Sequence, residues 1–182
     1  LFPFTMVFIT QFLSSNRVFF TFFIQKFVRK SVNIKWPNDL YIDDNKAGGI
    51  LIQNIIQGDI WKWAIVGIGI NVNQTSFDKD IPNPTSLKLI EEKDFNILEL
   101  AGNLLETINN YWQQLIHNQW KDIFEEYNKF LYKKDEQVFL KRNNTITPYT
   151  IDGVSEQGML QVKENKDVCF DIGEVIWVNK KY

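Results

Sequence analysis

The first 70 residues alternate between apolar runs and clusters of turn-forming residues, a pattern that predicts strands joined by tight connections. Residues 1–10 are rich in Phe, Thr, Val and Ile and predict a buried strand. The nearly all-apolar run 18–28 predicts a core helix that starts near Ser14. Further strands are expected at 32–36, 40–42, 49–56 and 60–67, separated by Pro, Asn, Asp and Gly turns. Together the strands from residue 32 onward form a predicted antiparallel meander.

Helical periodicity replaces strand alternation after residue 95. Asn96 precedes Glu99 by three positions, the capping-box arrangement with Asn in the Ser/Thr place. The face of this helix that we expect to be buried carries Ile97, Leu100, Ala101, Leu104, Leu105, Ile108 and Trp112. A second amphipathic helix is predicted at 120–131, and short strands with Gly and Asn turns from residue 136 predict a small β-barrel or sandwich. We therefore expect two domains, residues 1–133 and 134–182.

Composition narrows the function classes. The 182 residues carry a formal charge of −2 without a block of like charges, so neither a nucleic-acid surface nor a polybasic membrane patch is expected. Cys169 and His117 are the only residues of their types, which excludes an internal disulfide and a zinc ligand set and favours the cytoplasm. The apolar opening is too interrupted for the ~20 residues of a membrane-spanning helix. Because the chain begins inside a strand-like pattern, we expect it to be an N-terminally truncated fragment.

Two polar segments stand out against this background. Residues 35–39 read KWPND, and residues 46–51, KAGGIL, begin seven positions after Asp39. Lys46 together with bare glycine backbone can meet an anion, although a solvated lysine paired with Asp43 or Asp44 is the alternative. Glycines at the start of a strand are tolerated where a ligand or another backbone approaches closely. Asn38 and Asp39 are also common turn residues, so a structural role is open for them.

A third segment, residues 67–72, reads GIGINV. It lacks the third glycine and the following helix of a dinucleotide fingerprint, which makes a Rossmann interpretation poor. Two small residues would let a flat ring lie on the backbone, and Asn71 could offer a donor and an acceptor to an adenine edge. The alternative is a strand bulge against apolar neighbours. We assign Cys169 to core packing and His117 to the surface.

At these residues the chain resembles the biotin protein ligase family. The resemblance rests on KWPND, KAGGIL and GIGINV in the family's order and spacing, and extends to NPTSL at 83–87 and to 151–162 near the C-terminus. It implies an α+β fold: a mixed β-sheet flanked by helices, class II synthetase-like and shared with lipoate ligases, followed by a small SH3-like β-domain.

The resemblance also implies a reaction. Biotin and ATP would form biotinyl-5′-AMP, and a lysine of a biotin carboxyl carrier protein, a subunit of acetyl-CoA carboxylase, would then displace AMP. Lys46 would lie between carboxylate and phosphate, and Asp39 would orient the site or accept a proton. By motif match, the residues expected around biotin and the adenylate are Asn38, Gly49, Gly67, Gly69, Ile70 and Asn71. Mg²⁺ is expected with the phosphates, held by nucleotide and water, with no protein metal site.

The resemblance implies a Gly/Arg-rich loop upstream of the strand that opens this chain, and because the sequence starts at Leu1 we expect that loop to be missing. The sequence therefore leaves an inactive fragment open as an alternative to an active ligase. A lipoate–protein ligase relative is the other alternative, which KWPND, GIGINV and the C-terminal β-domain disfavour. A homodimer is possible, and an exposed strand edge would be an aggregation hazard.

Overall fold

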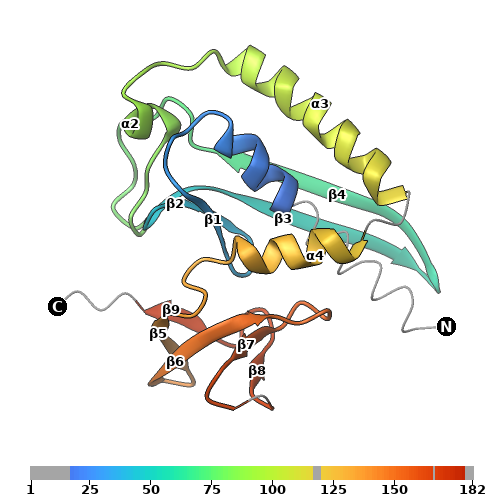
Figure 1. Cartoon of the computed structure of the whole chain (residues 1–182), viewed down its shortest axis with the longest axis vertical. Coiled ribbons are helices and arrows are strands. Elements are labelled where there is room, and N and C mark those ends of the chain that lie inside the picture. Colours follow the sequence, from blue (N-terminus) through green and yellow to red (C-terminus); the bar gives the residue numbers. More distant parts are fainter. Residues whose placement is uncertain (1–16, 117–119, 166, 179–182) are drawn as a thin grey trace.

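The elements follow the predicted order of strands, helices and strands. A computed structural model describes residues 17–116, 120–165 and 167–178, and Figure 1 traces the chain. Residues 17–25 are helical. The named elements are β1 (Val32–Lys35), β2 (Asp39–Ile42), β3 (Asn45–Gln57), β4 (Ile60–Ile70), α2 (Leu87–Glu91), α3 (Ile97–Ile116), α4 (Trp120–Lys129), β5 (Gln137–Arg142), β6 (Thr145–Val154), β7 (Leu160–Val162), β8 (Cys169–Phe170) and β9 (Ile176–Val178). The predicted strand at 1–10, the helix start at Ser14 and His117 lie outside the described residues.

The described strands form two antiparallel sheets. The first has the order β1-β2-β3-β4, which confirms the predicted meander, and the second has the order β8-β7-β6-β5-β9. The combination of helices with these sheets confirms the α+β class. In Figure 1 the helix over residues 17–25 and α3 lie along the first sheet, and α4 lies where the first sheet is nearest the second sheet. The chain passes from α4 to β5 through residues 130–136.

Two apolar cores hold the layers together. The first core packs helix 17–25 on the sheet through Phe20, Phe23 and Ile24, against strand residues such as Ile42 and Ile50. The second core combines side chains from β1, α4 and the second sheet: Ile34, Trp36, Tyr127, Leu131, Leu140, Ile151, Val154, Leu160, Val162 and Phe170 are all buried in it. The end of β1 therefore belongs to the core of the second sheet.

Two expectations about the helices need correction. On α3, Leu100 is buried, but Ile97, Leu105 and Trp112 are 58%, 68% and 45% exposed, so the buried stripe is narrower than the apolar pattern. Buried Thr107 shares the stripe, because its hydroxyl donates to Asn103 O at 2.8 Å. Helix α2, capped by the Ser86 hydroxyl, was not predicted.

Over the described residues, no helix is both long and apolar enough to cross a bilayer.

Candidate functional site

A single row of residues crosses all four strands of the first sheet. Lys35 on β1 lies opposite Asp39 on β2, Asp39 lies opposite Gly49 on β3, and Gly49 lies opposite Gly69 on β4. Directly opposed residues in antiparallel strands share a face of the sheet. The row therefore joins a cation and an anion to two positions of bare backbone on one face.

Lys46 completes the charged end of this row. Its Nζ lies 2.7 Å from Asp39 Oδ1, and the two side chains are 32% and 28% exposed. The alternative pairing of Lys46 with Asp43 or Asp44 is wrong, because Asp43 pairs with Lys30 at 2.9 Å and Asp44 with Lys133 at 3.2 Å. The predicted lysine and aspartate thus meet each other at a partly shielded position.

The backbone of Lys46 is held on both sides by the loop that follows β4. Its N–H donates to Asn83 O at 2.7 Å, and its carbonyl accepts from Thr85 N at 2.8 Å. The Asn71 side-chain Nδ2 donates to Thr85 O at 3.0 Å and to Lys46 O at 3.4 Å. The Asn71 amide nitrogen therefore serves the protein backbone, and its contact with an adenine edge stays a prediction.

The glycines of the two motifs differ in what the fold demands of them. A Cβ on buried Gly48 would collide with the backbone oxygen of Gly69, so the close approach of another backbone explains this glycine. A Cβ on Gly49 would lie 3.2 Å from Asn38 O and from Asp39 Oδ1.

Gly67 and Gly69 are exposed on the same face. A Cβ there would meet Leu51 O at 3.6 Å and Gly49 O at 3.9 Å, which are ordinary contacts. The described part of the fold therefore does not require glycine at either position. The bulge interpretation of this segment is wrong, because the β3–β4 register runs unbroken from Leu51↔Gly67 to Gly48↔Ile70.

Lys35 is a site-adjacent residue that the sequence interpretation did not single out. Its Nζ donates to the Tyr41 hydroxyl at 2.9 Å, and burial lowers the pKa of the Lys35 ammonium, partly offset by the charge of Asp39. Burial, with a smaller effect of Asp39, raises the pKa of Tyr41 to about 12. The sequence did hold a signal for Lys35: it lies four residues before Asp39 on the other side of Pro37, where two neighbouring strands were expected.

One small cavity lies beside these residues in the described part of the chain. Asn38 and Asp39 line a cavity of about 10 Å³ together with Arg17, room for roughly one water molecule. Arg17 was also missed, although it is the single charge at the start of an apolar run. Its Nε is buried and has no hydrogen-bond partner among the described residues, and burial lowers the pKa of its guanidinium. Among the residues with described placement, no group of three or more His, Cys, Asp or Glu could hold a metal ion.

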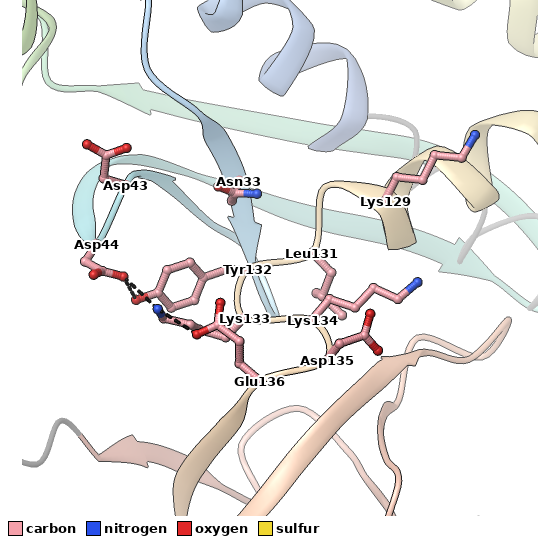
Figure 2. Close-up of a pocket in the computed structure, with 10 residues that line it drawn as sticks. All are labelled: Asn33, Asp43, Asp44, Lys129, Leu131, Tyr132, Lys133, Lys134, Asp135 and Glu136. Atoms are coloured by element: carbon pink, nitrogen blue, oxygen red, sulfur yellow. Dashed lines mark hydrogen bonds and ion pairs between the residues drawn. The ribbon is translucent and has the colours of Figure 1, made fainter.

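A larger pocket of about 420 Å³ lies elsewhere, where the β2–β3 turn meets the 130–136 connection (Figure 2). None of the predicted site residues lines it. In Figure 2 the side chains of Asp44, Tyr132, Lys133 and Glu136 point toward one another. Tyr132 OH donates to Asp44 Oδ1 at 2.7 Å, and Lys133 Nζ lies 3.0 Å from Glu136 Oε2. This charged cluster links the β2–β3 turn of the first sheet to the 130–136 connection, because its four side chains pair with one another.

The segment that holds these motifs is similar to a known protein family. Residues 6–71 match the model of the Biotin/lipoate A/B protein ligase family, a span that contains every predicted site residue. This segment of the chain is similar to that family. A longer match is to Biotin–protein ligase 2 of Arabidopsis thaliana, which is 26% identical over 153 residues, 78% of this chain and 44% of the relative.

A shorter match has a higher identity. The bifunctional ligase/repressor BirA of Bacillus spizizenii is 50% identical over 46 residues, which are 25% of this chain and 14% of that protein. The chain spans less than half the length of these curated relatives.

Among solved structures, the apo biotin protein ligase of Aquifex aeolicus superposes with a TM-score of 0.75 at 23% identity, over 99% of this chain and 80% of that one. The same ligase in complex with biotin and ATP superposes with a TM-score of 0.68 at 22% identity, over 97% and 72% of the two chains. These likenesses confirm the ligase fold.

Proposed function

We propose that this chain is a biotin protein ligase that activates biotin with ATP and transfers it to a carrier lysine. The observation that carries the proposal is the Lys46–Asp39 ion pair at one end of the exposed glycine row, inside the segment that matches the family. Gly67 and Gly69 have room for a side chain, so a ligand lying on the bare strand is a sufficient reason for their lack of one. The related Aquifex aeolicus ligase was solved in complex with biotin and ATP, which supports these two ligands for the present chain.

In the first step a biotin carboxylate oxygen attacks the α-phosphorus of ATP, and pyrophosphate leaves. Both reactants are negatively charged, so a cation between them reduces their repulsion and stabilises the charge that develops in the transition state. Lys46 is that cation in the proposal. Its backbone is already fixed by Asn83 and Thr85, so only the side chain has to leave Asp39 and turn to the phosphate.

In the second step the carrier lysine amine attacks the acyl carbonyl of biotinyl-5′-AMP, and AMP leaves. The attacking nitrogen must lose a proton, and Asp39, released from Lys46, is the carboxylate we propose to accept it. Asn38 and Asn71 would lie beside the adenylate. The wall of the pocket would be built from Gly49, Gly67, Gly69 and Ile70.

Mg²⁺ is proposed as the metal that accompanies ATP, where it neutralises phosphate charge. In the proposal this ion is held mainly by nucleotide and water, because Mg²⁺ seldom has an all-protein cage. The proposed carrier is a biotin carboxyl carrier protein, with that of acetyl-CoA carboxylase as the first choice. A cytoplasmic location and a possible homodimer remain parts of the proposal.

We also propose that residues 134–182 form the small SH3-like domain of this ligase. The second sheet begins at Gln137 and runs through five strands, and a core of its own residues, including Leu140, Ile151 and Leu160, is closed by Trp36. These features support the division at residues 133 and 134.

The direct test is transfer of labelled biotin to a carrier domain with ATP and Mg²⁺. We expect transfer by the chain and a loss of at least a hundredfold in Lys46→Ala, within the range for removal of a single transition-state contact (roughly 10²–10³). Lys62→Ala is the matched control, because Lys62 is exposed on the far end of the β3–β4 hairpin. Equal activity of Lys46→Ala and Lys62→Ala would refute the role of Lys46.

The same assay separates the alternatives. Lipoate competes for the site if the chain is a lipoate ligase relative. This alternative is tested because the matched family includes both biotin and lipoate ligases. A folded chain that binds biotinyl-5′-AMP without transferring biotin would identify a non-catalytic fragment. A folded chain with neither binding nor transfer would overturn the ligase proposal.

A further inference from the structure

Trp36, the second residue of KWPND, is embedded in the second sheet. It is 3% exposed and belongs to the buried cluster that contains Val154 and Leu160. Its indole Nε1–H donates to Gly158 O at 2.9 Å, across 122 positions of sequence. A buried Trp N–H needs a partner, and here the β6–β7 connection supplies it. The side chain therefore anchors the end of β1 to the second sheet.

Lys35, the residue before it, is surrounded by aromatic rings that come from both sheets. Its Nζ lies 4.6 Å from the ring centroid of Tyr41 on β2, 5.4 Å from that of Trp177 on β9 and 6.0 Å from that of Tyr132. Tyr132 in turn packs on Tyr41, with centroids 4.8 Å apart, and on Trp177 at 6.1 Å. Cation–π attraction and ring packing thus hold Lys35 against the second sheet.

The backbone makes the same connection. Ile34 N–H donates to Phe130 O, and Tyr132 N–H donates to Ile34 O, both at 2.8 Å. Residues 130–132 therefore lie along β1 as a short parallel bridge. The chain leading into the second sheet is attached to the strand that ends in the candidate site.

The residues on the other side of Pro37 face the site. Asn38 O accepts from Ile50 N–H at 2.9 Å, and Asp39 holds Lys46. Only Pro37 separates Trp36 from Asn38, and two residues of chain span at most roughly 7 Å, so fixing Trp36 restricts where Asn38 can lie. Proline adds stiffness because its φ is locked.

We propose that Trp36 is a positioning residue, through which the second sheet fixes Asn38 and Asp39 and thereby the Lys46 side chain. Lys35 acts with it from the opposite face of the strand. The structural part of this inference stands on the contacts alone, whereas its catalytic consequence rests on the proposed ligase function.

The structural part is tested by hydrogen exchange in Trp36→Phe, which keeps an aromatic ring and removes the donor to Gly158 O. We expect exchange of the Ile50 amide, the donor to Asn38 O, to accelerate about tenfold, the effect of losing one buried hydrogen bond. The Lys88 amide, which donates to Val72 O at 2.9 Å, serves as the internal reference and should not change.

Phe170→Leu is the matched control variant, since Phe170 is buried in the second sheet and its ring packs on Tyr149. It weakens the same core without removing the Trp36 hydrogen bond. Faster Ile50 exchange in Trp36→Phe than in Phe170→Leu supports the proposal. Unchanged Ile50 exchange in Trp36→Phe, or the same acceleration in both variants, overturns it.

The catalytic consequence is read from biotinyl-5′-AMP formation. Misplacing Lys46 removes an interaction made in the transition state, so we expect kcat to fall about tenfold in Trp36→Phe while KM for ATP and biotin stays within about twofold. A rise in KM with unchanged kcat would contradict positioning of Lys46. If the unaltered chain forms no adenylate but the exchange result holds, the ligase proposal fails and the positioning of the turn stands.

Discussion

Gly48 on β3 and Gly69 on β4 are diagonal neighbours, one position apart in the register, yet the structure predicts opposite responses to the same methyl group. In Gly48→Ala the new Cβ would meet the backbone oxygen of Gly69, which cannot rotate away as a side chain could. The two strands would have to separate at Gly48↔Ile70 and Gly49↔Gly69. Gly69→Ala is the control, because its Cβ would lie 3.9 Å from Gly49 O.

The expected magnitudes follow from these contacts. Overpacking costs about 1–3 kcal/mol, and the smaller backbone entropy of Ala in the unfolded chain offsets roughly 0.5–1 kcal/mol of it. Gly48→Ala should therefore lose about 1 kcal/mol of unfolding free energy, which corresponds to a fall in Tm of roughly 2–4 °C for a chain of this size. Gly69→Ala should be neutral or gain about 0.5 kcal/mol.

Urea denaturation followed by tryptophan fluorescence measures both changes, with thermal melts as an independent check. A Gly48→Ala variant as stable as Gly69→Ala would refute the reasoning, because it would mean that the β3–β4 spacing adapts without cost. Biotin transfer by Gly69→Ala adds a second result. A folded and fully active Gly69→Ala would remove the argument that a ligand lies on this strand.

Two further predictions concern the helices and the connection between the sheets. The Asn96 side chain caps α3 by accepting from Leu98 N at 3.1 Å. Asn96→Ala should therefore lower the free energy of unfolding by about 1 kcal/mol, whereas Asn96→Asp should not. Equal losses in both variants would contradict the cap. The Tyr132 hydroxyl holds the pKa of the Asp44 carboxyl below its usual value. Because the folded-state pKa is depressed, the contribution is present above the unfolded pKa of about 3.9 and is lost as pH falls through the folded pKa. Tyr132→Phe should thus have a lower free energy of unfolding than the unaltered chain at pH 7, by less than about 1 kcal/mol for this exposed pair. The difference between the two should disappear below about pH 4. A difference that persists in acid would contradict this.

Local patterns predicted the strands and caps of this fold well. Pro37 ended β1 as expected, and the turns at Asp43–Asp44 and Gly58–Asp59 fall between the predicted strands. Boundaries were less predictable: β4 continues past Gly67 to Ile70, because glycine weakens a strand without ending it when a paired neighbour supplies the ladder.

Burial on α3 could not be read from the sequence. Leu105 and Leu104 are identical in type and adjacent, yet Leu105 is 68% exposed and Leu104 is half-buried. Which of the two faces the sheet depends on the angle at which the helix crosses it, and apolar periodicity alone does not fix that angle.

At the candidate site, too, some features could be predicted from the sequence and others could not. The motifs predicted that Asp39 and Lys46 belong together, and the ion pair agrees with their assembly at one place, while their roles stay predictions. The partners of Lys35 and Trp36 could not be predicted, because Tyr132, Gly158 and Trp177 are about 100 or more positions away and carry no pattern that points back to the motif.

The hydrogen bonds around the Lys46 backbone have a practical consequence for chemical reconstruction of the site. Since Asn83, Thr85 and Asn71 hold the main chain, the position of the Cβ atom does not depend on which side chain it carries. Lys46→Cys alkylated with an aminoethyl group should return an amine to nearly the same point in space. With Cys169 the only native thiol, a Cys169→Ser background makes this alkylation selective.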